Sequence, residues 1–474
     1  MHEAISSSHS LRESFYNKRI LDSLLNELFK DLKIEMLIDF SITNFGPIKD
    51  TVKLSFEADD NSKLDNYYVM EPIPGVRLLK LALVYGANAS GKTTLIEALD
   101  FLRKLVVEPL DKKNNELDYT PFAFDDDVKW AFSSFDLNFI CNERVFHYNV
   151  QFNKKYIKEE TLAELVSGET HVIYVRTTDE ENQLSQINIR EEYKEVDDIA
   201  TKLEGATLWN NTVLGASLKT NVQFRLLNDI VEWFTEYLSS MISPSHSLYA
   251  YISSNLDDGR IMKEDILQMM KKADLMISDI LIKEDGEKDL DDVELLEKLR
   301  QRRERETHRE VKEIRVKVSR RHLEFVHTTE KGSGVLRYYQ ESLGTQRFYQ
   351  FSGLVDLLVR NSVFFSIDEV EASLHPDLFE FFLYSFLCNA KHSQLLATTH
   401  YREFLMNGDM VRPDAIWFTD KKADGSTVLY SLMDFDETIF TSNRSFYDAY
   451  KIGRLGAKPN IGDYYMDFYH EGKK

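Results

Sequence analysis

The sequence of 474 residues has few cysteines, no long apolar run and no excess of positive charge. Its two cysteines, Cys141 and Cys388, are too few for a disulfide framework and lack metal-ligand spacing, which favours reduced core thiols in a cytoplasmic protein. The apolar run Phe381–Cys388 is too short to cross a bilayer and is typical of a buried helix. The N-terminus has no apolar core of a secretory signal. We therefore expect a cytoplasmic protein without membrane contact.

Acidic residues outnumber basic ones by 79 to 58, which gives a formal net charge of −21. This charge argues against a surface that binds nucleic acid throughout, because phosphate binding needs concentrated Lys and Arg. One local exception is the basic run Lys298–Arg321, which follows the acidic stretch Glu284–Asp292. Two interpretations of this run stay open: a surface for nucleic acid or an acidic partner, and a solvated helix and hairpin with Glu–Arg pairs.

The most informative stretch that is present begins with a short apolar run, Leu81 to Tyr85. The loop GANASGKT follows, and then apolar residues at helical spacing. This order predicts a strand, a phosphate-binding loop and a helix, with backbone N–H groups and the helix dipole directed at phosphate oxygens. Lys92 is placed to meet the β- and γ-phosphates, and the hydroxyl of Thr93 to bind Mg²⁺. The predicted nucleotide-binding residues are Gly86, Ala87, Asn88, Ala89, Ser90, Gly91, Lys92, Thr93 and Thr94.

Two further buried strands end in residues that suit phosphate chemistry. The apolar run Val363–Ile367 is typical of a strand covered on both faces, and Asp368 and Glu369 follow it. Asp368 can help to hold Mg²⁺ and Glu369 can polarise an attacking water; the alternative is an acidic pair at a helix start. The run Gln394–Thr399 ends at His400, which either contacts the γ-phosphate or caps the strand end.

A second phosphate-seeking turn precedes the predicted helix Phe348–Val359. Ser342 and Gly344 lie just ahead of the helix N-terminus, where backbone N–H groups attract anions. A simple N-cap beside a flexible glycine is the alternative. Because the chain already has one phosphate-binding loop, this turn predicts a site that one copy completes for another.

The pattern along the chain predicts an α/β P-loop nucleoside triphosphatase (NTPase) fold with a mixed sheet core, an antiparallel β lobe and a mainly helical insertion. Strands are expected at 37–45, 52–56, around Phe122 and Phe124, at 135–139 and at 145–152. The expected domains are an amphipathic helical extension over 1–35, which packs on the protein or docks a partner, the first half of the core over 36–160, the helical insertion over 161–330 and the second half of the core over 331–474.

These motifs together carry a resemblance to a known family. GANASGKTTL, ESLGTQR, DEVEASLHP, LLATTH and YKIGRLGAKP resemble the ABC-type ATPase heads of the SMC and RecF kind. More narrowly, the chain from about Met36 to Pro459 resembles the bacterial AAA-type, ABC-like ATPases of phage-defence and abortive-infection systems, of the RloA and AbiLi type. The resemblance implies that Lys92 and Thr93 bind ATP with Mg²⁺. It also implies that Asp368 supports the metal, Glu369 is the general base and His400 is the switch histidine.

The resemblance also implies partners. Ser342 and Gly344 would form the signature that closes over the ATP of the opposite subunit, although Ser-Leu-Gly-Thr-Gln departs from the usual Ser-Gly-Gly-Gln. No Q-loop glutamine is identified. The implied function is an ATPase that forms dimers or higher homo-oligomers and acts as the sensor of a defence pair, its partner being a nuclease or another toxic effector. The alternatives are a DNA-maintenance ATPase that binds DNA through Lys298–Arg321 and a nucleotide-gated scaffold with hardly any turnover.

Overall fold

The computed structural model divides the chain into two compact units. Unit 1 comprises Met1–Pro244, Leu358–Val370 and Leu387–Lys474, and unit 2 comprises Ser245–Leu357 and Glu371–Phe386. The structure describes residues 33–193, 198–221, 224–284, 321–435 and 446–458, and the backbone of 288–289 and 317–318. The predicted N-terminal helix over residues 1–35 lies, except for its last three residues, outside the described residues.

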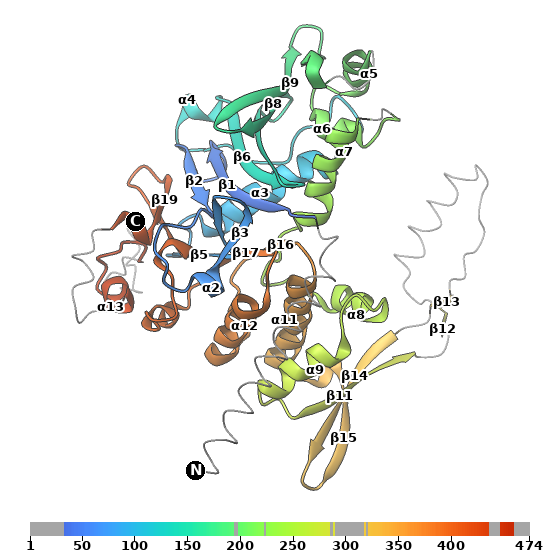
Figure 1. Cartoon of the computed structure of the whole chain (residues 1–474), viewed down its shortest axis with the longest axis vertical. Helices are drawn as coiled ribbons and strands as arrows, with labels where there is room; N and C mark the ends of the chain where they lie inside the picture. Colours follow the sequence, from blue (N-terminus) through green and yellow to red (C-terminus); the bar gives the residue numbers. More distant parts are fainter. Residues whose placement is uncertain are drawn as a thin grey trace, which may run out of the picture. The chain divides into compact units, whose positions relative to one another are not determined.

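The first sheet of unit 1 is five-stranded, with the order β16-β17-β5-β18-β19, and only β19 is antiparallel to its neighbour (Figure 1). Its strands are β5 (Leu81–Gly86), β16 (Phe364–Ile367), β17 (Gln394–Thr398), β18 (Ile416–Lys421) and β19 (Thr427–Ser431). Strands β5, β16 and β17 are buried along their whole length, as their apolar runs predict. Because they run parallel and adjacent, their carboxyl ends meet at one edge of the sheet.

The second sheet of unit 1 is seven-stranded and antiparallel, with the order β10-β9-β8-β7-β6-β1-β2. Its strands are β1 (Met36–Thr43), β2 (Val52–Ser55), β6 (Ser133–Cys141), β7 (Arg144–Phe152), β8 (Ile157–Val166), β9 (Glu169–Asp179) and β10 (Leu184–Ile189). Buried and partly exposed residues alternate along β7, which is typical of a sheet with one face on the core. The predicted mixed core with an antiparallel lobe is confirmed.

Helix α3 (Lys92–Val107), which follows the phosphate-binding loop, packs against both sheets. It contacts β5 and β17 of the first sheet and β1 of the second. The ring centroid of Phe101 lies 5.5 Å from that of Phe152 and 6.2 Å from that of Phe135. These aromatic contacts fix the helix, and so the loop at its N-terminus, between the two sheets.

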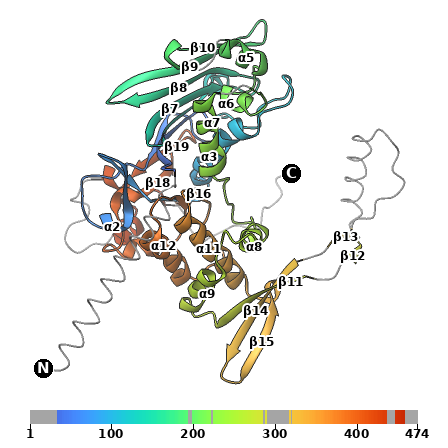
Figure 2. The same cartoon turned by 45° about the vertical axis from the view of Figure 1, so that its right-hand side comes forward.

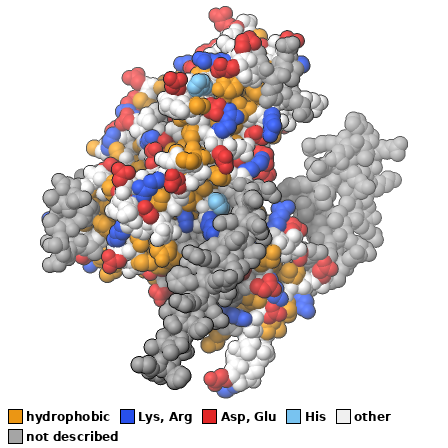
Figure 3. All heavy atoms as spheres, in the orientation of Figure 1, with side chains coloured by type: hydrophobic (Ala, Val, Ile, Leu, Met, Phe, Trp, Pro, Cys, Tyr) orange, Lys and Arg blue, Asp and Glu red, His pale blue; other side chains and the backbone are white. Residues whose placement is uncertain are grey.

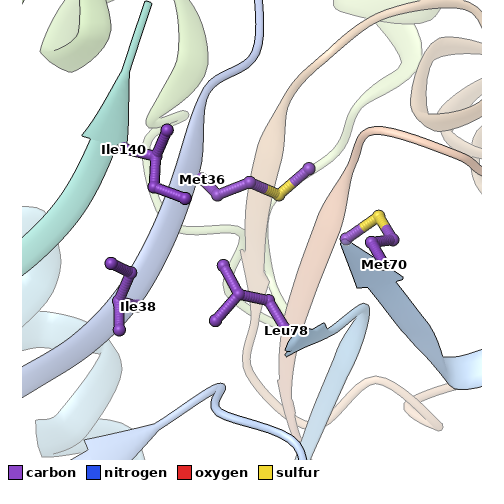
Figure 4. Close-up of a cluster of buried hydrophobic side chains, with 5 residues drawn as sticks. All are labelled: Met36, Ile38, Met70, Leu78 and Ile140. Carbon is purple, nitrogen blue, oxygen red and sulfur yellow. The ribbon is translucent and has the colours of Figure 1, made fainter. Parts of the chain in front are cut away.

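A smaller apolar cluster joins β1 and β6 to the hairpin of β3 (Val69–Ile73) and β4 (Val76–Leu79). Figure 4 shows its buried members, which are Met36, Ile38, Met70, Leu78 and Ile140. The remaining helical elements of unit 1 are α2 (Asp65–Tyr68), α4 (Asp126–Lys129), α5 (Ile199–Ala206), α6 (Val213–Ser217), α7 (Arg225–Glu232), the π-helical turn η2 (Trp233–Tyr237) and α13 (Phe446–Lys451). Short 3₁₀ turns are η1 (Glu191–Tyr193), η4 (Arg402–Met406), η5 (Pro413–Ala415) and η6 (Leu432–Asp434).

Two local expectations are wrong. The segment 161–330 is helical only in its middle, from α5 to α9, because its first part continues the antiparallel sheet as β8, β9 and β10 and its last part forms another sheet. In β10 every second side chain is buried, a period of two that marks a strand despite its polar composition. Phe122 and Phe124 form no strand, because the side chain of Asn44 binds the backbone of their segment.

Unit 2 has its own antiparallel sheet, with the order β11-β14-β15. Its elements are β11 (Ile277–Glu284), β12 (Lys288–Asp289), β13 (Lys317–Val318), β14 (Arg321–Thr329), β15 (Gly332–Arg337), α8 (Tyr249–Asp257), α9 (Lys263–Lys272), the 3₁₀ turn η3 (Tyr338–Gln340), and most of α11 (Leu343–Arg360) and α12 (Pro376–Asn389). The buried ring of Phe325 in β14 lies 5.4 Å from that of Tyr349 in α11. Helices α11 and α12 lie side by side (Figures 1 and 2), with Phe351 and Phe382 4.6 Å apart between ring centroids.

The buried carboxyl group of Glu35 makes the stability of unit 1 depend on pH. Glu35 is 7% exposed, and its Oε2 has no hydrogen-bond partner. Burial raises its pKa from 4.5 to about 7, against smaller lowering effects of the Cys141 thiol and Lys33. The folded protein therefore binds this proton more tightly than the unfolded chain, so stability falls as pH rises from 4.5 to 7.

We expect Glu35→Gln to raise the free energy of unfolding by about 3 kcal/mol at pH 8 and to change it little at pH 4.5, because the amide cannot ionise. Urea unfolding at both pH values measures this difference. The exposed Glu116 provides the control variant Glu116→Gln, which should show no such pH dependence. An equal effect of Glu35→Gln at both pH values would contradict the prediction.

Candidate nucleotide-binding site

The loop from Gly86 to Gly91 connects β5 to the N-terminus of α3, as predicted. Gly86 must lack a side chain, because a Cβ there would lie 2.3 Å from Thr419 Oγ1 and 2.4 Å from Ser90 Oγ. Gly91 is the N-cap of α3 with φ of 101°, a left-handed conformation that favours glycine. The sixteen-residue helix thus presents its positive end at the loop.

Two threonines from the first sheet hold the loop, and neither was identified from the sequence. The hydroxyl groups of Thr419 in β18 and Ser90 lie 2.6 Å apart. Thr427 at the start of β19 donates a hydrogen bond of 2.9 Å to the carbonyl of Ser90. These contacts fix the loop conformation before any ligand is bound, which lowers the entropy cost of binding.

The side chain of Lys92 lies along the same loop. Its ammonium group donates to the carbonyl oxygens of Gly86, at 2.9 Å, and Ala87, at 3.1 Å, and the residue is only 5% exposed. A loop with backbone N–H groups at a helix N-terminus and a lysine ammonium alongside has the donor set that phosphate groups need.

Asp368 joins two of the predicted motifs. Thr93 donates to its Oδ2 at 2.9 Å, and Thr398 at the end of β17 donates to its Oδ1 at 2.5 Å. Asp368 is 5% exposed, so its charge is held in a nearly dry position. A threonine hydroxyl and one carboxylate, completed by substrate phosphates and water, are the oxygen ligands that Mg²⁺ takes in nucleotide sites.

Glu369 and His400 follow neighbouring strands of this sheet. Glu369 has φ of 46°, an uncommon conformation for a residue with a side chain, and its amide donates to Thr398 Oγ1 at 2.8 Å. The next amide, of Val370, donates to the carbonyl of Thr398 at 3.0 Å. His400 is exposed just beyond β17, the strand between β16 and β5. The structure thus brings both residues to the sheet edge that carries the phosphate-binding loop.

Other residues near Asp368 were not predicted. The amide of Asp368 donates to the carbonyl of Ile242, so the stretch that ends at Pro244 runs beside β16. Glu97 of α3 has an exposed side chain, yet desolvation and the charges of Asp368 and Asp100 raise its pKa.

Ser342 and Gly344 belong to unit 2. The Ser342 hydroxyl accepts a hydrogen bond of 3.1 Å from the amide of Thr345 in the first turn of α11, as an N-cap does. A Cβ at Gly344 would lie 3.3 Å from the carbonyl oxygen of Ser373. Next to this turn, Glu341 Oε1 and Nε2 of His327 in β14 lie 2.6 Å apart. This contact attaches the turn to the sheet of unit 2.

Other predictions concern charge and membranes. The run Lys298–Arg321 lies outside the described residues except for the backbone of 317–318 and Arg321, so nucleic-acid binding through it stays a prediction. On the face in Figure 3, basic and acidic side chains are interspersed.

Among the described helices, none has both the length and the apolar composition of a membrane span. No set of three or more His, Cys, Asp or Glu in the described part of the chain is placed to hold a metal ion.

Comparison with known proteins identifies one family, and the similar solved structures include SMC head domains. The model of the family described as "AAA domain, putative AbiEii toxin, Type IV TA system" matches residues 81–407. Among solved structures, an SMC head domain from Thermotoga maritima is 12% identical, with a TM-score of 0.37, over 83% of this chain and 98% of that chain. An SMC head bound to the C-winged helix domain of ScpA is also 12% identical, with a TM-score of 0.38, over 83% and 97%. No curated protein sequence matches the chain.

Proposed function

Since the chain belongs to the family of AAA domains whose model covers residues 81–407, we propose that it binds and hydrolyses ATP and thereby controls a separate toxic effector in anti-phage defence. The observation that carries the ATPase proposal is the hydrogen bond from Thr93 to Asp368. It joins the helix that follows the phosphate-binding loop to the acidic end of β16 in the same sheet. These are the two parts that a Mg²⁺-dependent nucleoside triphosphatase requires.

The roles follow from the contacts. The loop amides and Lys92 would bind the phosphates, and Lys92 would exchange its carbonyl contacts for phosphate oxygens. Thr93 and Asp368 would hold Mg²⁺, which when bound neutralises charge on the phosphates. Glu369 would accept the proton of the attacking water, and His400 would contact the γ-phosphate from the adjacent strand end.

A second copy of the chain would complete the site. The turn of Ser342 and Gly344 at the N-terminus of α11 has donors for a phosphate, but the same chain already offers a complete loop. ATP would therefore join two copies, or a larger homo-oligomer, by binding to the loop of one and the signature turn of the other.

The effector would be a separate protein. The family description names a toxin and a toxin–antitoxin system, which supports a role in growth control or defence. A nuclease is the kind of partner that such an ATPase would restrain and release.

Release of ADP and phosphate from ATP by the purified wild-type protein tests the proposal. We expect hydrolysis with Mg²⁺ present and none with EDTA in excess, because Thr93 and one carboxylate cannot neutralise the phosphate charge without the metal. Hydrolysis that persists in EDTA would contradict the assignment of Thr93 and Asp368.

The second-copy contact makes its own prediction. Ser342→Arg places a long side chain at the signature turn, so ATP-driven self-association should weaken at least about tenfold, while ATP binding by single chains is retained. Sedimentation velocity with and without MgATP measures both states. Ser333→Arg, at an exposed position of β15 in the same unit, is the matched control and should associate as wild type does. Unchanged association of Ser342→Arg would remove this turn from the interface.

A further inference from the structure

The segment between α3 and β6 is firmly attached beside the phosphate-binding loop although it has little regular structure. The buried carboxamide of Asn44 donates to the carbonyls of Val128, at 2.9 Å, and Ala131, at 3.0 Å, and accepts from the amide of Phe122 at 2.9 Å. The amide of Gly46 donates to the carbonyl of Thr120 at 2.7 Å. Residues 120–131 therefore have one fixed path around the turn at Asn44–Gly46.

Two series of contacts connect residues 120–131 to the neighbourhood of the phosphate-binding loop. On one side, a Cβ at Gly46 would lie 3.0 Å from Cγ2 of Thr94, at the start of α3. On the other side, a Cβ at Gly425 would lie 3.2 Å from Cδ2 of Phe124. Two residues after Gly425, Thr427 donates a hydrogen bond to the loop carbonyl of Ser90. Phe124 therefore packs on the turn that leads directly into a residue holding the loop, within unit 1.

The ring of Phe124 is supported from behind and open in front. It packs edge-on against Phe122, with 5.7 Å between ring centroids, and against the turn at Gly425. Asp125, the next residue, forms an ion pair with Lys49, with 2.8 Å between Asp125 Oδ2 and Lys49 Nζ. Even so, Phe124 is 73% exposed. An exposed aromatic ring that packs by its edge on a neighbouring ring is the arrangement that proteins use to stack a nucleobase.

We propose that Phe124 stacks on the base of the nucleotide whose phosphates the loop binds, an inference that rests on the proposed ATP site. The ribose separates the base from the phosphates, so the base must lie on a surface that borders the loop rather than within it. Every nucleobase has a π face, so stacking on Phe124 favours nucleotides over inorganic polyphosphate and does not by itself select adenine. The base would contribute affinity through its contact area with the ring of Phe124 and not through hydrogen bonds.

Calorimetric titration with MgATP and with inorganic tripolyphosphate tests this proposal. Phe124→Ala should weaken ATP binding about tenfold and leave tripolyphosphate binding unchanged, while Phe124→Tyr should bind ATP as wild type does. Trp130→Ala is the matched control, because Trp130 is 80% exposed in the same segment, and it should bind both ligands normally.

Two results would overturn the inference alone: unchanged ATP affinity in Phe124→Ala, or an equal loss of affinity for both ligands, which would show an indirect effect on the loop. Wild-type protein that binds neither ligand would overturn the proposed ATP site together with the inference. The tripolyphosphate titration therefore distinguishes the two failures.

Discussion

The Glu369→Gln variant is expected to hydrolyse ATP about a thousandfold more slowly than wild type while it still binds ATP. Gln keeps the size of the side chain, and the amide of residue 369 can still donate to Thr398 Oγ1. It cannot accept a proton from water, so the step that a general base assists is lost. Binding persists because the loop, Lys92 and Asp368 are unchanged. Single-turnover hydrolysis and a separate nucleotide-binding assay measure the two effects.

The same variant separates the proposed enzyme from the alternatives. A slow Glu369→Gln enzyme should accumulate in the ATP-bound, self-associated state, whereas a nucleotide-gated scaffold with hardly any turnover would behave alike with either residue. Glu403→Gln makes the same chemical change on η4 of unit 1 and should hydrolyse ATP at the wild-type rate. Wild-type turnover in Glu369→Gln would show that another group activates the water.

The parallel core could be predicted from the sequence because continuous apolar runs mark its strands. The apolar runs of β5, β16 and β17 are buried throughout, and each is followed directly by a polar motif. Parallel strands in one sheet end at the same edge, so Lys92, Asp368 and His400 could be grouped without knowledge of the strand order. The contact of Thr93 with Asp368 agrees with this grouping.

The groups that fix the site could not be predicted, because their partners lie far apart in sequence and belong to no motif. Thr419 and Thr427 contact Ser90 across more than 300 positions. Gln394 is similar: its buried carboxamide binds the backbone of Leu37 and Leu79, in strands of other sheets. Only the folded sheets bring these polar groups within reach of one another.

Residues 161–189 show how a local pattern can mislead. Strands β8 to β10 contain many polar and charged side chains, so their period of two is weak beside the helical spacing that follows. Their identity depends on successive pairing, of β8 with β7, β9 with β8 and β10 with β9, and β7 precedes the segment. Burial of Glu160 in this sheet, with hydrogen bonds from Tyr148 and Tyr174, is a tertiary feature that a sequence pattern does not reveal.

Lys92→Ala is expected to weaken ATP binding about a hundredfold or more and to reduce hydrolysis to background. The ammonium group lies along the loop that would bind the phosphates, so its loss would leave them without their nearest cation. Lys92→Arg should not restore activity, because a planar guanidinium cannot replace a compact ammonium inside this loop. Thermal unfolding without nucleotide should remain close to that of wild type, which separates lost binding from lost folding.

Mixing Lys92→Ala with Ser342→Arg then tests whether two copies share each site. In a dimer of one copy of each variant, the intact loop of the Ser342→Arg chain faces the intact turn of the Lys92→Ala chain, so one of the two sites is complete. Random pairing of equal amounts makes half of the dimers mixed, and hydrolysis should recover to about a quarter of the wild-type rate. No recovery in the mixture would contradict the shared site, while the role of Lys92 would still rest on its own variant.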